Sequence, residues 1–280
     1  MIKISLLVIN NINIKFEQAT IIVIFKQQTM KKLILSLMLV VFALPMSAQS
    51  DFYVTLWYGQ VKNSEAQSHI EIEREYYSKM WKEQITQGNI LGWDMWQIMN
   101  PDVNEMTTTF IYVTLHTSPT FSMSPVNSIP GKSDEDWQAA QKEAMNHYVK
   151  NYSVIMSVKG GYGPQMGGTP PEYAVLNYMQ VDPYRAAEYE RAELEDFMPS
   201  FKENDKVRKG WGLHKVLNHY GTENPINYVT ADFYDSYDAI LTARNNTGEM
   251  SEEDMAFWKK FDEVRTLADS HIVRLVQAVR

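Results

Sequence analysis

The sequence contains no cysteine. This absence excludes disulfide bridges, thiolate metal sites and cysteine nucleophiles together. It also excludes a lipoprotein-type signal, because the lipid is attached to a cysteine at the cleavage point.

Other signatures of function are missing as well. The chain has neither a G-x-S-x-G nucleophile turn nor a glycine loop that leads into a helix, as phosphate-binding loops do. Acidic residues outnumber basic ones, the formal net charge is −8, and no basic stripe is visible. Nucleic-acid binding needs clustered Lys and Arg to neutralise phosphates, so we expect no nucleic-acid partner.

Residues 30–48 have the pattern of a cleavable export signal. Two lysines supply the positive start, and the apolar run 33–44 follows them. A membrane-spanning helix needs about 20 apolar residues, so this run is too short to serve as one. We expect cleavage near Ala48 and a periplasmic or secreted protein that keeps no membrane anchor.

Residues 1–29 precede this signal and show no amphipathic order. A signal works poorly when it lies inside a chain, so we expect Met30 to be the true start and residues 1–29 to be a spurious extension. A genuinely long N-terminal region is the alternative. The part removed by cleavage carries five lysines and one glutamate, so the remaining chain is more acidic still.

The rest of the chain aligns with itself. FYVTLWYGQV at 52–61 matches EYAVLNYMQV at 172–181, at an offset of 120 residues. After a two-residue slip the offset is 118, and SDEDW at 133–137 matches SEEDM at 251–255. Agreement over four successive elements predicts an internal duplication.

Each copy is predicted to form a strand, a helix, two strands and a final helix. The strand segments are rich in Val, Ile, Tyr, Phe and Thr, and the helical segments have apolar residues at helical spacing. The predicted fold class is therefore α+β, built from two β-α-β-β-α repeats at 51–158 and 172–280. A linker rich in Gly and Pro, 159–171, joins them, and no strand is expected after the last helix.

This element order, used as a pair, resembles the ferredoxin-like modules of the dimeric α/β-barrel superfamily. The resemblance covers most of the chain after the signal. It implies a pseudodimeric α/β barrel of two facing antiparallel sheets with helices outside. The superfamily includes cofactor-independent monooxygenases of antibiotic biosynthesis, EthD-like proteins and chlorite dismutase-like enzymes. No catalytic residue is carried over, because the resemblance lies in element order and not in a motif.

Haem-binding members of this superfamily hold iron through a helical histidine. His69, His147 and His271 lie on predicted helices, but none is matched by a histidine in the other copy. We expect these three to be solvated and predict no cofactor, with haem as the alternative. His214 and His219 do not share one strand face at their spacing, so no metal site is predicted.

One helix of the second copy is rich in carboxylates. Arginines alternate with them, which is typical of an exposed face stabilised by ion pairs. We therefore expect no acid–base role for these residues, which are Glu188, Glu190, Glu193 and Glu195.

A candidate ligand site follows from strand positions at which the two copies differ. Trp57 matches Asn177, and Trp96 matches His214. A single asymmetric site would give this pattern, as would ordinary drift on a partly solvated sheet. His214 and Asp232 are the candidate base and its orienting group. The predicted ligand-binding residues are Trp57, Trp96, Tyr112, Asn177, His214 and Asp232.

Three functions remain open. The preferred one is binding of a small apolar or aromatic molecule in the barrel between the repeats, because aromatic-lined concave sites suit such ligands. The alternatives are an enzyme resembling the cofactor-independent monooxygenases, with His214 as its base, and a non-catalytic interaction module with a closed core. The sequence does not indicate the oligomeric state.

Overall fold

A computed structural model describes residues 52–99, 106–120, 126–163, 168–218, 225–245 and 251–280. Residues 51–280 form one compact unit. The predicted export signal, the segment before it and His219 lie outside the described residues. Within the described ranges no helix is both long enough and apolar enough to cross a membrane.

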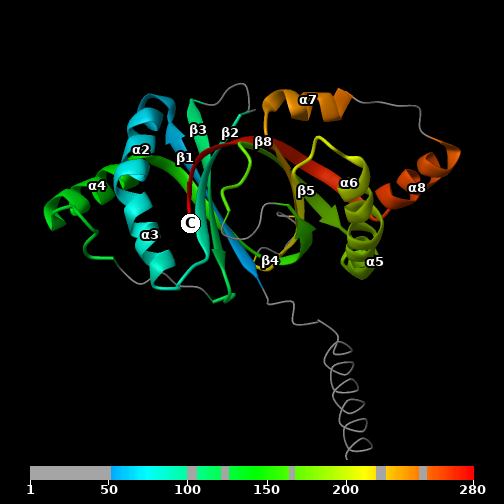
Figure 1. The fold of residues 1–280 in the computed structure, drawn as a ribbon, viewed down its shortest axis with the longest axis horizontal. Coiled ribbons are helices and arrows are strands. Elements are labelled where there is room, and N and C mark those ends of the chain that lie inside the picture. Colours follow the sequence, from blue (N-terminus) through cyan, green and yellow to red (C-terminus); the bar gives the residue numbers. More distant parts are fainter. Residues whose placement is uncertain (1–51, 100–105, 121–125, 164–167, 219–224, 246–250) are drawn as a thin grey trace, which may run out of the picture. The chain divides into compact units, whose positions relative to one another are not determined.

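The first half of this unit has the order strand, helix, strand, strand, helix, strand (Figure 1). Its last helix begins after Ser133, whose hydroxyl accepts a hydrogen bond of 3.1 Å from the backbone N–H of Asp136 and so caps the helix. The elements are β1 (Tyr53–Lys62), η1 (Asn63–Glu65), α2 (Ala66–Ile72), the π-helical turn η2 (Glu73–Tyr77), α3 (Ser78–Thr86), β2 (Gly92–Ile98), β3 (Thr107–His116), α4 (Asp134–His147) and β4 (Tyr148–Tyr162).

The second half has the same order with one additional helix, α7, before its last helix. Its first helix is also interrupted by a π-helical turn, η4. The elements are β5 (Tyr173–Val181), η3 (Pro183–Arg185), α5 (Ala186–Arg191), η4 (Ala192–Phe197), α6 (Met198–Asn204), β6 (Gly210–Val216), β7 (Tyr228–Tyr234), α7 (Tyr237–Asn245), α8 (Glu252–Asp262) and β8 (Arg265–Val279).

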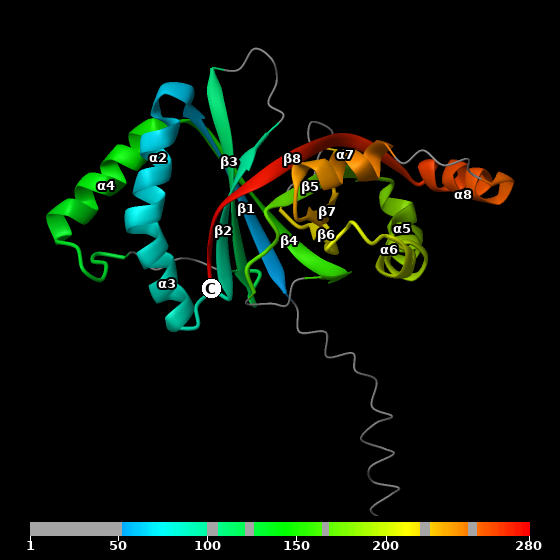
Figure 2. The ribbon, with the colours of Figure 1, turned by 45° about the horizontal axis from the view of Figure 1, so that its top comes forward.

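The eight strands close into one antiparallel barrel in the order β1-β3-β2-β8-β5-β7-β6-β4. The closure depends on β4 and β8, each of which pairs with a strand of either half. β4 pairs with β1 and β6, while β8 pairs with β5 and β2. In Figure 2 the red strand β8 passes from one half to the other. Every strand of the barrel therefore has two neighbours, which leaves no edge for pairing with other chains.

These closing strands correct the sequence analysis. The last segment of the chain, which was expected to be helical, is the strand β8, so His271 lies on a strand. The strand β4 continues to Tyr162 and enters the segment expected to be a linker. At Gly161 a Cβ would lie 2.5 Å from the backbone oxygen of Trp211, so this glycine permits the close pairing with β6. The mixed fold with an antiparallel barrel is confirmed.

Alternation along the strands gives each strand one face toward the barrel interior and one toward the helices. In β1, Leu56 and Tyr58 belong to the barrel core, whereas Trp57 packs in a separate cluster on the other face. The hydroxyls of Tyr58 and Tyr178 share a hydrogen bond of 2.9 Å between β1 and β5. Figure 1 shows α2, α3 and α4 beside the strands of the first half and α5, α6 and α8 beside those of the second.

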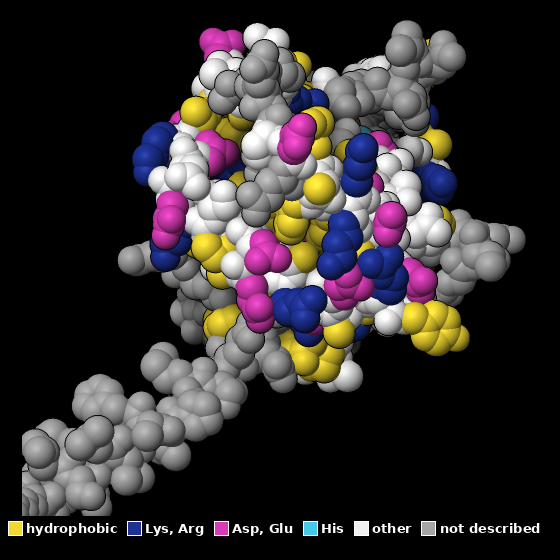
Figure 3. All heavy atoms as spheres, turned by 90° about the vertical axis from the view of Figure 1, so that its right-hand side faces the viewer, with side chains coloured by type: hydrophobic (Ala, Val, Ile, Leu, Met, Phe, Trp, Pro, Cys, Tyr) yellow, Lys and Arg dark blue, Asp and Glu magenta, His cyan; other side chains and the backbone are white. Residues whose placement is uncertain are grey.

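The helix side of the second half carries charges of both signs, as Figure 3 shows. Lys159 and Lys215 pair with Glu190 at 3.1 Å and 3.6 Å. Glu193 is an exception to the predicted exposed face, because it is buried beneath the helix. The face in view is mixed in charge, and the absence of a nucleic-acid partner stays a prediction.

Candidate functional site

The principal candidate site is a cavity of about 460 Å³ on the helix-facing side of the first-half strands. Its walls come from strands β1, β2 and β3, from the helical segment around η2, from α4 and from the start of β4. Aromatic side chains make up much of its lining. The lining residues are Thr55, Trp57, Glu73, Tyr77, Met80, Trp81, Trp93, Tyr112, Thr114, Val126, Gln141, Met145 and Tyr148. We call this the outer cavity.

Strand register explains why the aromatic residues meet here. Trp57 on β1 is directly opposite Tyr112 on β3, and both point away from the barrel interior. Their ring centroids are 5.1 Å apart, and the Tyr148 ring lies edge-on to Trp57 at 4.8 Å. Such pairs favour offset and edge-to-face contacts at these separations. The outer cavity therefore offers flat apolar walls to a ligand.

A buried histidine organises the polar groups beside the outer cavity. The hydroxyl of Tyr148 donates to that of Tyr112 at 2.9 Å, and both hydroxyls lie close to His69 Nε2, at 3.0 Å and 2.6 Å. On the other side of the ring, His69 Nδ1 is 3.3 Å from His147 Nδ1. Because the Tyr112 hydroxyl accepts from Tyr148, its own proton is available to His69 Nε2, and donation there places the proton of the His69 ring on Nδ1. His69 and His147 were expected to be solvated, and both are buried instead.

Glu73 is the acid of this cluster. It follows His69 by one helical turn, and its Oε1 lies 3.6 Å from His69 Nε2. It opens the π-helical turn η2, a local irregularity that is frequent at functional sites. Its side chain is buried and lines the outer cavity, yet its Oε2 has no hydrogen-bond partner among the described residues. Trp93 Nε1 is a second buried polar atom of the lining without a described partner.

Burial sets the protonation states of this pair. Desolvation raises the pKa of Glu73 from 4.5 to about 8, although the Tyr148 hydroxyl opposes the rise. Desolvation, with the nearby His147, lowers the pKa of His69 from 6.5 to about 4. Both groups are thus mainly uncharged at neutral pH, and only Glu73 titrates near it. A carboxyl group with such a pKa is suited to general acid–base catalysis at physiological pH.

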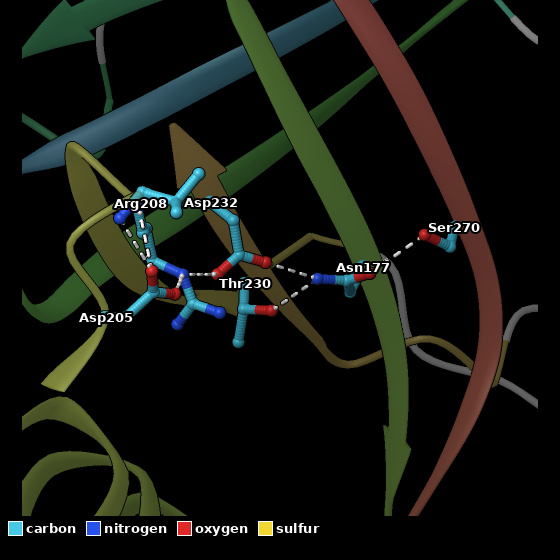
Figure 4. A network of polar contacts seen from close by, with 7 residues as sticks. Asn177, Asp205, Arg208, Thr230, Asp232 and Ser270 are labelled. Carbon is cyan, nitrogen blue, oxygen red and sulfur yellow. Dashed lines mark hydrogen bonds and ion pairs between the residues drawn. The ribbon is translucent and has the colours of Figure 1, made fainter. Parts of the chain in front are cut away.

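The corresponding region of the second half contains Asn177 and Asp232, which take part in a polar network (Figure 4). Asn177 donates to Asp232 at 2.7 Å and accepts a hydrogen bond of 2.9 Å from Ser270. Arg208 lies 3.2 Å from Asp232 and 3.4 Å from Asp205. Burial raises the pKa of Asp232, and Arg208 and Asn177 oppose the rise, so this carboxyl group is engaged by fixed partners of the protein.

His214 and Trp96 lie on the opposite side of the strands, where they line the barrel interior. His214 Nδ1 donates to the backbone oxygen of Val229 at 3.3 Å, and burial lowers the pKa of His214 to about 4. Asp232 is on the helix-facing side, opposite Trp211 in the register of β6 and β7. The structure therefore does not bring His214 and Asp232 together as a base and its orienting group. Of the predicted ligand-binding residues, it places only Trp57 and Tyr112 in the outer cavity.

Two of the three histidines considered as haem ligands are held in other contacts. Both ring nitrogens of His69 are engaged by tyrosine hydroxyls and by His147. His271 is on a strand, 3.1 Å from Asp269, and lines neither the outer cavity nor the barrel interior. Across the described part of the chain, no group of three His, Asp or Glu side chains is arranged to hold a metal ion.

No protein-family profile and no curated protein matches this sequence. Solved structures do match the fold. A candidate monooxygenase from Lactobacillus acidophilus has a TM-score of 0.53 at 8% identity, over 82% of this chain and 96% of that one. A candidate monooxygenase from Fusobacterium nucleatum has a TM-score of 0.51 at 11% identity, over 83% of this chain and 95% of that one.

At these identities the likeness is one of fold alone, and it is consistent with the dimeric α/β-barrel superfamily. An anthrone oxidase-like protein follows, with a TM-score of 0.49 at 13% identity, over 82% of this chain and 93% of that one. Chlorite dismutase and haem-binding structures also match, with TM-scores of 0.45. A likeness that low does not bear on a cofactor, and these neighbours lend no support to the expectation that there is none.

Proposed function

We propose that this protein is an oxygen-dependent enzyme resembling the cofactor-independent monooxygenases, with its active site in the outer cavity. The observation that carries the proposal is the Oε2 atom of Glu73, which is buried, lacks a partner among the described residues and belongs to an aromatic cavity. An unpaired buried acceptor is costly to a folded protein, and such costs are concentrated at functional sites. The two similar folds described as candidate monooxygenases favour this alternative over simple binding.

The lining indicates the substrate class. Trp57, Trp81 and Tyr112 would hold a flat aromatic molecule between them. Glu73 Oε2 would accept a hydrogen bond from the acidic C–H or O–H group of this molecule, and Trp93 Nε1 would donate to one of its oxygens. A carbonyl compound with an activated methylene or a phenol has both groups.

Glu73 would act as the base. In its ionised form it takes a proton from the activated methylene or hydroxyl, and the resulting anion is easily oxidised by O₂. When a methylene becomes a carbonyl, one oxygen atom of O₂ enters the substrate and the other leaves as water, which balances the four electrons without an added reductant. Burial keeps His69 neutral and Tyr112 and Tyr148 hold its ring in place, so that only Glu73 changes charge during the cycle.

We also infer that the two halves descend from one duplicated β-α-β-β-α-β unit. Glu73 and Glu193 occupy matching positions in η2 and η4, and burial raises both pKa values, that of Glu193 to about 7. The partners of the two acids differ, because Arg265 and Arg208 act on Glu193 while Glu73 has no arginine among the groups that shift its pKa. We assign catalysis to the first half for this reason.

The compartment is a separate proposal. The signal-like segment 30–48 supports action in the periplasm or outside the cell. Fractionation of the producing cell, with N-terminal sequencing of the purified protein, would locate the protein and its first residue. A cytoplasmic protein that keeps residues 30–48 would refute export.

Anthrone is the probe that we would use to test the enzyme activity, because it has an activated methylene between aromatic rings and one carbonyl. Oxygen consumption and quinone absorbance would be followed at pH 8 for the wild type, Glu73→Gln and Glu71→Gln. Loss of general base catalysis costs about 100-fold or more, so Glu73→Gln should lose at least that factor. Glu71 is exposed on the same helix, so Glu71→Gln should react like the wild type.

Two results would refute this assignment. One is a Glu73→Gln variant that folds and oxidises anthrone as fast as the wild type. The other is anthrone turnover that continues at the same rate when O₂ is removed. If the protein binds anthrone in the outer cavity but does not oxidise it, the ligand site is supported and the proposed enzyme activity is refuted.

A further inference from the structure

A second cavity lies inside the barrel. Its volume is about 230 Å³, and strands of both halves form its walls. Because strand residues alternate between the two faces, its lining shares no side chain with the outer cavity. Residues of the lining include Val54, Leu56, Trp96, Leu176, Ala231 and Phe233. We call this the inner cavity.

The size of the inner cavity is unusual for a protein core. Protein interiors are packed like organic crystals, with few voids larger than a water molecule. Empty space of this size removes packing contacts from the side chains around it, which weakens the fold. Apolar cavities of about 150 Å³ stay dry and accept benzene, so this larger one has room for a bicyclic molecule.

The charged groups of the lining are already paired, which determines the kind of ligand that fits. Arg280 lies 2.8 Å from Asp94 Oδ1 and donates to its Oδ2 at 3.0 Å. Arg280 also donates from Nε to the backbone oxygen of Gly168 and from Nη1, the nitrogen nearest Asp94 Oδ1, to those of Trp93 and Val279. A charged ligand would find no free countercharge in this pair, whereas a neutral one would leave it intact.

His214 supplies one polar contact. Its Nδ1 is used by the backbone oxygen of Val229, so Nε2 carries the lone pair. The ring lies against Gly212, where a Cβ would be 3.0 Å from Cε1 of the histidine. An uncharged imidazole in this position can accept one hydrogen bond from a hydroxyl or an N–H group.

We propose that the inner cavity binds a small, neutral, largely aromatic molecule of one or two rings, with one hydroxyl or N–H directed to His214 Nε2. This site is separate from the outer cavity and does not depend on Glu73. Binding of this molecule would then take place in the inner cavity, and oxidation in the outer cavity between the sheet and the helices.

The test uses 1-naphthol and naphthalene as probes, with the full chain. Calorimetric affinities would be measured for the wild type and for Ala231→Leu, whose larger side chain fills the inner cavity. Ala231→Leu should bind both probes at least tenfold more weakly. Ala231→Val is a milder filling variant in case Ala231→Leu fails to fold. Ala268→Leu, on an exposed part of β8, is the matched control and should bind like the wild type.

Two further measurements locate the probes. His214→Phe keeps an aromatic ring of slightly larger size and removes the acceptor, so the preference for 1-naphthol over naphthalene should disappear. Crystals soaked with 1-bromonaphthalene should show bromine inside the barrel, in the wild type and in Glu73→Gln alike. Bromine only in the outer cavity, or unchanged affinity in both filling variants, would overturn the proposal. Loss of anthrone turnover in Glu73→Gln with barrel binding intact would separate the two sites.

Discussion

Glu73→Gln should change the pH dependence of folding stability. The pKa of Glu73 is about 8 in the folded protein and 4.5 ordinarily, because burial disfavours the carboxylate. The folded state therefore binds the proton more tightly than the unfolded state. The stability that this proton contributes is complete below pH 4.5 and is lost as the pH rises through 8.

The size of the effect follows from the two pKa values. Each pKa unit corresponds to about 1.4 kcal/mol, so a difference of about 3.5 units corresponds to on the order of 5 kcal/mol. Glutamine has nearly the same shape and stays neutral. The unfolding free energy of the wild type minus that of Glu73→Gln should therefore decrease by several kcal/mol between pH 5 and pH 9.

Urea unfolding followed by circular dichroism at pH 5, 6, 7, 8 and 9 would measure this difference. His69, whose lowered pKa reduces stability as the pH falls from 6.5 toward 4, is present in both proteins, so its contribution largely cancels. Glu71→Gln should follow the wild type at every pH, because Glu71 is exposed. A wild-type-minus-Glu73→Gln difference that is constant from pH 5 to pH 9 would refute a buried acid with a raised pKa.

Three further predictions concern activity and stability. Anthrone oxidation should increase with pH as Glu73 ionises, with its midpoint at about 8, the pKa of Glu73; a profile that is flat from pH 6 to pH 9 would exclude it as the base. In urea unfolding, Ser133→Ala should lower the unfolding free energy by about 1 kcal/mol through loss of the α4 cap. Ser133→Thr keeps a capping hydroxyl and should retain most of this stability. Asp232→Ala should cost about 3 kcal/mol of unfolding free energy, because Arg208 and Asn177 lose a buried partner; a cost below 1 kcal/mol would contradict the network in Figure 4.

Much of the fold was predictable from local sequence. In each half, the order of strands and helices up to the last helix (α4 or α8) follows from the spacing of the apolar residues. The cap at Ser133 follows from its spacing to Asp136. The strands β4 and β8 were missed because their segments have no clear alternation and continue directly from helices. Their strand state depends on pairing with strands of both halves, which neighbouring residues along the chain do not reveal.

The candidate site was predictable only in part. Trp57 and Tyr112 were identified from divergence between matching positions, but they face the helices and not the barrel interior. His69 and Glu73 were missed because polar residues on an amphipathic helix are usually solvated. Two signals were available: their spacing of four residues, and the match of Glu73 with Glu193 among aromatic neighbours. His214 and Asp232 are on adjacent strands, but the alternation of side chains along each strand places them on opposite faces of the sheet.

Infrared difference spectroscopy of the wild type against Glu73→Gln would show directly whether Glu73 is a protonated acid that meets the ligand in the outer cavity. We expect a protonated carboxyl band at pH 6 that belongs to Glu73, disappears with a midpoint near pH 8 and shifts when anthrone is added. The shift would report the hydrogen bond between the ligand and the acid in the outer cavity. No such band at pH 6, or a band that anthrone leaves unchanged at saturating concentration, would contradict the assignment of Glu73 as the base of this site.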